Sequence, residues 1–465
     1  MPVSDTMKRL IAIIVLTLVT AIVMILAGLN QLQVIAVTLF SFKTFATLLF
    51  WRYRLGFAFL AIALLLALNV IDIPHLIEFA SFDVILFLIS MMTVVGFLEE
   101  KGFFEYLLHK IMRAVGSNGY MLMVVMMLAA GLFAALVDEV TSILFMTAIM
   151  LHLTGRFGIR PIPFVMMLVF ATNIGSSATV VGNPVGVMIA FRGGLSFSDF
   201  LRWATPISFL ALIVTLGICL KIFSKNIREL DNSLNSSLEN SESENTTASQ
   251  QGMAIPWIIF IGTIVFLALH HPIEELFHLE RNVLLIGTAM AAASVALLID
   301  LERGREIIER RVDWRTLLFF ALLFASVGTL QYVGITDLLA KGIFSISGGS
   351  DVGVLLTLTP IAAILSAFMD NVLAVAMFLP IVARLGETGV HAFPLWWAML
   401  FAGTFFGNLT LIGSTANIVA NGMLEREKKE HITFIEWIKS GAIVSIPTLA
   451  LAITLILLQM PLMPK

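Results

Sequence analysis

The sequence AALVDEVTS at residues 134–142 interrupts an apolar run that extends from 119 to 154, and SAFMDNV at residues 366–372 interrupts a second run at 351–387. Each run is too long for one membrane crossing, which takes about 20 apolar residues, and each breaks near its middle. Loop backbone is tolerated inside a bilayer only where it meets protein or a water-filled cavity. Both runs are therefore predicted to be re-entrant hairpins whose tips lie in a cavity inside the membrane.

The composition is typical of a membrane protein. Hydrophobic residues make up 59% of the 465 positions and charged residues 13%, against roughly 25% charged residues in soluble domains. A soluble enzyme is excluded, and a net charge of −3 provides no basic surface for nucleic acid. The single cysteine, Cys219, rules out a disulfide framework and a cysteine metal site. We therefore expect no enzyme activity, no catalytic residues and no resident cofactor, and a lipid bilayer as a partner.

Outside the hairpins, eleven apolar runs are long enough to cross a bilayer. They are 9–28, 32–50, 55–72, 82–98, 163–190, 199–222, 253–270, 281–300, 314–332, 394–421 and 434–460. With the N-terminus in the cytoplasm, 21 Lys and Arg residues fall on the inner side and six on the outer side, as the positive-inside rule requires. The sequence thus predicts an integral protein of the cytoplasmic (inner) membrane, with its N-terminus inside and its C-terminus outside.

A polar segment at 226–251 divides the chain into two halves. It is rich in Ser, Asn and Glu and too polar to pack a core, so it is predicted to be a disordered cytoplasmic linker. The first half, 1–225, is predicted to combine scaffold helices with a transport unit at 82–222. The second half, 252–465, is predicted to combine scaffold helices with an inverted transport unit at 314–460.

The two halves contain an internal repeat. An offset of 232 aligns Asp138 with Asp370, and an offset of 231 aligns Thr179 with Thr410. Chance similarity among apolar residues would not align such polar positions. An odd number of crossings separates equivalent spans, so the copies run in opposite directions through the membrane. Inverted broken-helix units that meet near the midplane are the signature of secondary transporters. Further aligned pairs are Gly96 with Gly328 and Gly182 with Gly413.

The helix after each hairpin is also predicted to be broken, at 173–184 and at 407–417, where Gly, Ser, Thr and Asn cluster. Freed backbone carbonyls and side-chain oxygens in such stretches can replace the hydration shell of a cation. Neither hairpin tip and neither broken stretch contains Lys or Arg, so we expect a small cation to bind there. The predicted binding residues are Asp138, Glu139, Thr141, Asn173, Ser177, Thr179 and Asn183 in the first repeat and Asp370, Asn371, Asn408, Thr410, Ser414, Thr415 and Asn417 in the second.

These polar residues also admit structural interpretations. Asp138 and Asp370 could cap the returning half-helices, and the Ser and Thr residues could serve helix packing. A carboxylate at this depth costs at least ~2.5 kcal/mol, which favours a function in which a proton and a metal cation compete for the oxygens of Asp138 and Asp370. The N-termini of the half-helices suit an anion, so an anion accompanied by sodium is an open alternative.

Three segments together resemble the ion transporter superfamily. They are the hairpin tip and apolar run from Met369 to Pro380, ATVVGNP at 178–184, and the stretch 408–417. The branch that the chain is most similar to contains arsenite efflux pumps, NhaD-type sodium/proton antiporters and the P protein, with a citrate-transporter-like domain. The resemblance implies a homodimer in which a mobile transport subdomain shifts like an elevator against a scaffold.

The same resemblance assigns the binding residues at the hairpin tips to Asp138, Glu139, Asp370 and Asn371. Glu139 is a departure, because the branch has Asn at this position. The added carboxylate means that an ion stoichiometry or an anionic substrate does not transfer directly from the branch to this chain.

The leading functional hypothesis is secondary active transport, with Na⁺ exchanged for H⁺ at Asp138 and Asp370. The alternatives are efflux of arsenite or another small oxyanion, and sodium-coupled carboxylate transport. Thiol capture of arsenite is unavailable, because Cys219 is alone. A channel with an acidic filter is a further alternative. An intramembrane aspartyl protease would need two aspartates that share a proton, but the chain lacks a Gly-x-Gly-Asp motif.

Overall fold

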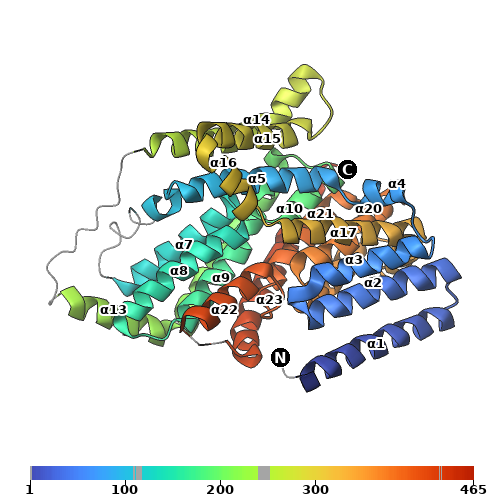
Figure 1. Ribbon diagram of the computed structural model, residues 1–465, viewed down its shortest axis with the longest axis horizontal. Helices are drawn as coiled ribbons and strands as arrows, with labels where there is room; N and C mark the ends of the chain where they lie inside the picture. The colour runs from blue at the N-terminus through green and yellow to red at the C-terminus, as the bar shows by residue number, and fades with distance from the viewer. Residues whose placement is uncertain (1–2, 108–109, 111–117, 239–251, 429, 431) are drawn as a thin grey trace.

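The computed structural model describes residues 3–107, 110, 118–238, 252–428, 430 and 432–465. Within these ranges all regular secondary structure is helical (Figure 1). Ten of the described helices are long and apolar enough to cross a membrane. The predicted class, an all-α polytopic membrane protein, is confirmed. The division into mobile and fixed parts stays a prediction.

Two groups of helices outside the repeats lie at opposite edges of the molecule (Figure 1). The first group consists of α1 (Val3–Leu26), α2 (Gln31–Leu49), α3 (Arg54–Ala67) and α4 (Ile73–Phe79), and the second of α14 (Ala254–Phe277), α15 (Val283–Ile299) and α16 (Leu301–Arg310). Helices α3 and α4 pack on α17, whereas α15 and α16 pack on α5. Each group therefore covers the first helix of the repeat in the other half of the chain.

Apart from α18 in the second repeat, the two repeats have the same order of helices. The first consists of α5 (Phe82–Glu100), α7 (Gly119–Leu136), α8 (Glu139–Phe157), α9 (Ile162–Gly175), α10 (Pro184–Gly193) and α12 (Thr205–Ile222). The second consists of α17 (Trp314–Tyr332), α18 (Ile335–Ile346), α19 (Asp351–Phe368), α20 (Asn371–Glu387), α21 (Ala392–Phe406), α22 (Thr415–Lys428) and α23 (Phe434–Gln459). Helices α7 and α8 meet at Asp138, and α19 and α20 meet at Asp370, as predicted from the polar interruptions.

The repeats interlock through their broken helices. The half-helix α22 of the second repeat contacts α8 and α9 of the first, and α10 of the first repeat contacts α20 and α21 of the second. Between α9 and α10 the chain forms only two short 3₁₀ turns, Ser176–Ala178 and Val180–Gly182. Each repeat thus places a half-helix against the hairpin of the other, so both halves build the interior.

The predicted span at 55–72 is shorter in the structure. The run at 55–72 forms α3, which has 14 residues and covers only about 21 Å, less than the ~30 Å of a bilayer core. The chain then turns at Asn69, whose φ of 54° is left-handed, and Asn tolerates that conformation better than most residues. The short helix α4 follows, and its N-cap is Asp72, whose side chain accepts a hydrogen bond from the backbone of His75.

The predicted disordered linker at 226–251 begins instead as a helix. Residues Ser224–Leu238 form α13, while 239–251 lie outside the described residues. The prediction rested on polar composition and is wrong for this part of the segment. Ile227 and Leu230 are one helical turn apart and both are buried, because the helix packs against α7. The carboxylate of Asp231 also accepts a hydrogen bond of 2.7 Å from the backbone N–H of Gly119.

We predict that Gly119→Ala lowers thermal stability by separating α13 from α7. A Cβ at this position would lie 2.9 Å from Asp231 backbone atoms, and overpacking of this kind costs about 1–3 kcal/mol. The matched control is Gly217→Ala, because a Cβ there meets nothing within 4 Å. Thermal unfolding of the two variants in detergent measures the difference. Equal melting temperatures would show that α13 does not dock on α7.

Candidate functional site

Asp138 forms the N-terminal cap of α8. One carboxylate oxygen accepts hydrogen bonds from the backbone N–H groups of Val140 and Thr141 at 2.7 and 2.9 Å, and the other accepts from the Thr141 hydroxyl at 2.5 Å. The helix N-terminus carries partial positive charge, which stabilises the anionic carboxylate. The capping interpretation from the sequence is therefore correct for Asp138, and its second oxygen still lies next to a hydroxyl.

Asp370 occupies the equivalent position at α20. It is 1% exposed, and one oxygen accepts from the backbone N–H of Val372 at 3.1 Å. The other oxygen accepts from the hydroxyl of Thr415 at 2.6 Å. Since Thr415 begins α22, this hydrogen bond fixes the hairpin tip to the broken helix of the same repeat.

The two hairpin tips meet at Glu139. This side chain is 1% exposed, and its oxygens accept hydrogen bonds from the Asn371 amide at 3.4 Å and from the Ser176 hydroxyl at 3.3 Å. Glu139 and Asn371 are 232 positions apart, so they are equivalent residues of the two repeats. A contact between equivalent residues lies on the pseudo-twofold axis that relates two copies. The structure thus brings the acidic tips together inside the protein.

Amide side chains form a second contact between the repeats. Asn173 donates hydrogen bonds to the side-chain oxygens of Asn408 and Asn417 at 2.7 and 2.8 Å, and its own oxygen accepts from the Ser414 hydroxyl at 3.0 Å. All four residues are fully or almost fully buried. Four of the predicted binding residues therefore satisfy one another and fix the broken helices together.

The paired threonines hold each broken helix against its hairpin. Thr179 donates to the backbone oxygen of Ala135, and Thr410 donates to that of Ala367. Glycine is required next to them, because a Cβ at Gly182 would lie 2.1 Å from a backbone oxygen. The threonine hydroxyl groups are thus used in the same way in both repeats.

Two other predicted residues have different surroundings. The side chain of Asn183 caps α10 by accepting from the backbone N–H of Gly186 at 2.8 Å, and Asn183 also lines the cavity described next. Ser177 turns away from the hairpin tips, since its hydroxyl contacts that of Ser208 on α12 at 2.7 Å. The structure therefore does not bring Ser177 to the acidic site.

A cavity of about 510 Å³ leads to the acidic tips. Five of the predicted residues line it, namely Asp138, Glu139, Thr141, Asn183 and Thr415. At its mouth Arg311 pairs with Glu99 at 2.5 Å and with Glu100. Carboxylate and hydroxyl oxygens therefore converge at the inner end of a space that is large enough for a hydrated ion or a small organic ion.

Arg54 lines the same cavity and is a buried residue that the sequence prediction missed; the cavity is also lined by the arginines at 52, 310, 311 and 315. It is 6% exposed, and its guanidinium group lies 4.1 Å from the Trp51 ring centroid and 4.8 Å from that of Phe319. One terminal nitrogen donates to the Thr316 hydroxyl at 2.9 Å. The other, Nη1, has no hydrogen-bond partner among the described residues. A buried basic group therefore borders the cavity, although the hairpin tips and the broken stretches contain none.

Arg54 lies outside the hairpin tips and the broken stretches, the segments whose lack of Lys and Arg predicted a cation site. In the sequence it belongs to WRYR at 51–54, which looks like an ordinary cytoplasmic loop between two apolar runs. The tryptophan beside it was the one available signal, since arginine often stacks on aromatic faces.

The class of protein follows from three features: ten apolar helices long enough to span a membrane, two inverted repeats, and an acidic contact at the end of a cavity. Together they indicate a membrane transporter. A family model described as "Citrate transporter" (CitMHS) matches residues 45–343 and 327–464. The chain belongs to this family.

Similar proteins agree with the class. A Mycobacterium tuberculosis protein named uncharacterized transporter Rv2684 is 31% identical over 385 residues, which cover 80% of this chain and 85% of the relative. The human P protein is 25% identical over 462 residues, covering 82% of this chain and 54% of that protein. The crystal structure of the Alcanivorax borkumensis YdaH transporter, reported to have an unusual topology, shares the fold with a TM-score of 0.58 at 16% identity, over 84% of this chain and 87% of that chain.

We predict that Asn173→Ala destabilises the contact between the repeats. The variant loses three hydrogen bonds, each worth about 0.6 kcal/mol in membrane proteins, and leaves buried partners unsatisfied, so the loss should be about 2 kcal/mol or more. The control is Thr172→Val, because the neighbouring Thr172 hydroxyl has no hydrogen-bond partner in the described part of the chain. Thermal unfolding in detergent should show a lower melting temperature for the first variant alone. A similar melting temperature for both would contradict a stabilising role of the amide cluster.

Proposed function

We propose that this protein is a secondary active transporter that exchanges Na⁺ for H⁺. The observation that carries the proposal is the contact of Glu139 with Asn371 at the inner end of the cavity, next to Asp138. The two hydrogen bonds to Glu139, at 3.3 and 3.4 Å, are long for bonds to a carboxylate. An under-satisfied buried carboxylate favours either a proton or a cation as its further partner.

The ligand set supports a small cation. Asp138 and Glu139 supply carboxylate oxygens, and Thr141 and Thr415 supply hydroxyl oxygens around the same cavity. Hard cations take oxygen ligands of these kinds. Protonation of the carboxylates removes the negative charge that holds the cation, so binding of the two ions is mutually exclusive. Asp370 acts from the adjacent tip, where Thr415 connects it to the cavity lining.

The transport cycle that we infer is an elevator-like alternation. The two hairpins and the broken helices form the mobile unit, and α1 to α3 with α14 to α16 form the scaffold. We further propose a homodimer in the cytoplasmic membrane with the N-terminus inside and the C-terminus outside. The arginines at the mouth of the cavity support this orientation, because basic residues concentrate on the cytoplasmic side.

We predict that Asp370→Asn and Glu139→Gln each slow Na⁺-driven proton movement in proteoliposomes by at least about tenfold, which corresponds to ~1.4 kcal/mol. Both variants retain the size of the side chain and remove the exchangeable charge. The control is Glu280→Gln, since Glu280 is exposed. A pH-sensitive dye inside the vesicles reports the flux. Wild-type flux in Asp370→Asn would disprove the proposal.

A small anion is the second candidate substrate, and Arg54 is the observation that favours it. Its buried Nη1 has no hydrogen-bond partner among the described residues, and such a group suits a carboxylate or an oxyanion such as arsenite, for which arginine provides fixed, planar donors. The acidic tips then hold the coupling Na⁺ or H⁺, so this candidate corresponds to sodium-coupled carboxylate transport or oxyanion efflux.

We predict that Arg54→Met abolishes stabilisation by anions and preserves stabilisation by Na⁺. A ligand at ten times its Kd raises stability by about 1.4 kcal/mol, which thermal unfolding in detergent resolves. The probes are citrate and arsenite, each tested with Na⁺ and with K⁺. The control is Arg52→Met, because Arg52 lines the same cavity but is exposed. Stabilisation by neither anion in the wild type would eliminate the second candidate.

A further inference from the structure

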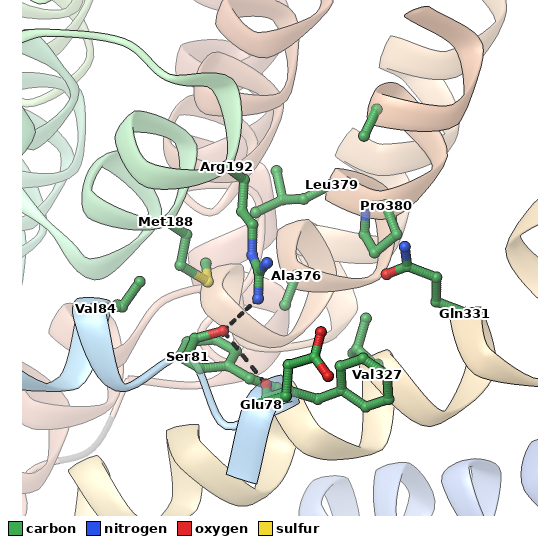
Figure 2. A pocket seen from close by; sticks show the side chains of 14 residues that line it. Glu78, Ser81, Val84, Met188, Arg192, Val327, Gln331, Ala376, Leu379 and Pro380 are labelled. Atoms are coloured by element: carbon green, nitrogen blue, oxygen red, sulfur yellow. Dashed lines mark hydrogen bonds between the residues drawn. The ribbon is translucent and has the colours of Figure 1, made fainter. Parts of the chain in front are cut away.

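A second cavity of about 270 Å³ lies between α4, α5, α10, α17 and α20 (Figure 2). Figure 2 shows Arg192 reaching from α10 to Ser81, with Glu78 beside them and Gln331 on α17. The Arg192 guanidinium donates to the Ser81 hydroxyl at 2.5 Å. The cavity is therefore polar at this end, although no residue of the predicted binding site lines it.

The lining of this cavity repeats the lining of the first one. Most of its fourteen lining residues, shifted by 232 positions or by 231 in α10, give residues that line the cavity at the acidic tips. The correspondence extends over all five elements. Three of the pairs are Phe79 with Arg311, Val327 with Val95, and Gln331 with Glu99. The two cavities are thus related by the same pseudo-twofold axis as the repeats.

A pair of glycines gives independent support for this relation. A Cβ at Gly328 would lie 2.3 Å from the Phe79 ring, and a Cβ at Gly96 would lie 2.6 Å from Cβ of Arg311. In both repeats a residue three positions before the first helix of one copy therefore packs directly on a glycine in the first helix of the other. The same close contact borders both cavities.

The cavities differ in depth. The first one reaches Asp138 and Glu139, whereas the second is bounded by Ala376, Leu379 and Pro380 on α20. Ala376 is five residues from Asn371 at the start of that helix, which is about 7.5 Å along the helix axis. Of the two symmetry-related cavities, the first thus reaches the acidic tips and the second does not.

We propose that the second cavity is the outer access site for the transported ion. The site takes the same small hydrated ion as the acidic tips. In the wall of this cavity, the hydrogen bond between Arg192 and Ser81 joins α10 to the segment before α5. This inference rests on the proposed transport function, and it adds the route by which the ion reaches the side opposite the first cavity. Exchange between the two states would deepen one cavity as the other closes, since inverted repeats exchange their conformations.

The experiment uses two equivalent valines as reporters of accessibility. Val327→Cys lies in the second cavity and Val95→Cys in the first, and both valines are 5% exposed. The background is Cys219→Ser, which removes the single native cysteine. A membrane-impermeant thiol reagent is added to right-side-out and to inside-out vesicles. We expect labelling of Val327→Cys from the outer face and of Val95→Cys from the inner face.

Ligands should then shift the two labelling rates in opposite directions. If Na⁺ binds one state tenfold more tightly than the other, the ratio of the two rates should change about tenfold at saturation. Val352→Cys is the control, because Val352 is 44% exposed and should label at a rate independent of ions. If Val327→Cys folds poorly, Gln331→Cys with its partner Glu99→Cys replaces the pair.

The outcomes separate this inference from the antiport proposal. Failure of the outer reagent to label Val327→Cys and Gln331→Cys, or an unchanged rate at these positions while Val95→Cys responds to ions, would overturn the outer access site. Reciprocal changes with citrate or arsenite, together with wild-type Na⁺-driven proton flux in Asp370→Asn, would overturn the antiport proposal and uphold the access site.

Discussion

The hydrogen bond between Glu139 and Asn371 is the constraint on which the architecture depends. A carboxylate that is 1% exposed needs donors, and in this chain one of its donors belongs to the opposite repeat. Neither half of the chain can satisfy the group alone. The two hairpin tips must therefore meet, and the helices that carry them must interlock, which places α22 on α8 and α10 on α20.

The broken helices follow from the same requirement. Unwinding a helix frees backbone groups that have no water to bind inside a bilayer, and polar side chains take over as partners. Asn417 donates to the backbone oxygens of Gly407 and Thr410 at 2.8 Å each, and Asn183 donates to that of Ser176 at 2.8 Å. The clusters of Asn, Ser and Thr are thus needed to form the breaks, whatever ion the protein carries.

The sequence predicted the breaks well and the contacts between repeats poorly. Polar residues inside apolar runs mark Asp138 and Asp370 as break points, because the cost of placing them in lipid is visible in the sequence. The partnership of Asn173 with Asn408 depends on how two halves interlock, and the spacing of residues within one half carries no such information. The place of Arg54 could not be predicted for a related reason, since the first residue of α3 becomes part of the cavity only when α3 packs on α17. Helix α13 was missed because two buried side chains, Ile227 and Leu230, outweigh a polar composition.

The asymmetry at the axis explains why two acidic tips can touch. If both equivalent positions carried a carboxylate, like charges would face each other in a medium of low dielectric constant, where their repulsion is strong. One of the two would then hold a proton, as in other buried carboxylate pairs. With Asn371 opposite Glu139 the tips are joined by an amide donor. Asp138 and Glu139 of the first tip line the cavity together with Thr415, whereas Asp370 of the second tip is buried and does not line it. The charge that a cation or a proton must neutralise is therefore concentrated where the open cavity ends, and the departure from exact symmetry gives the site both its stability and its access.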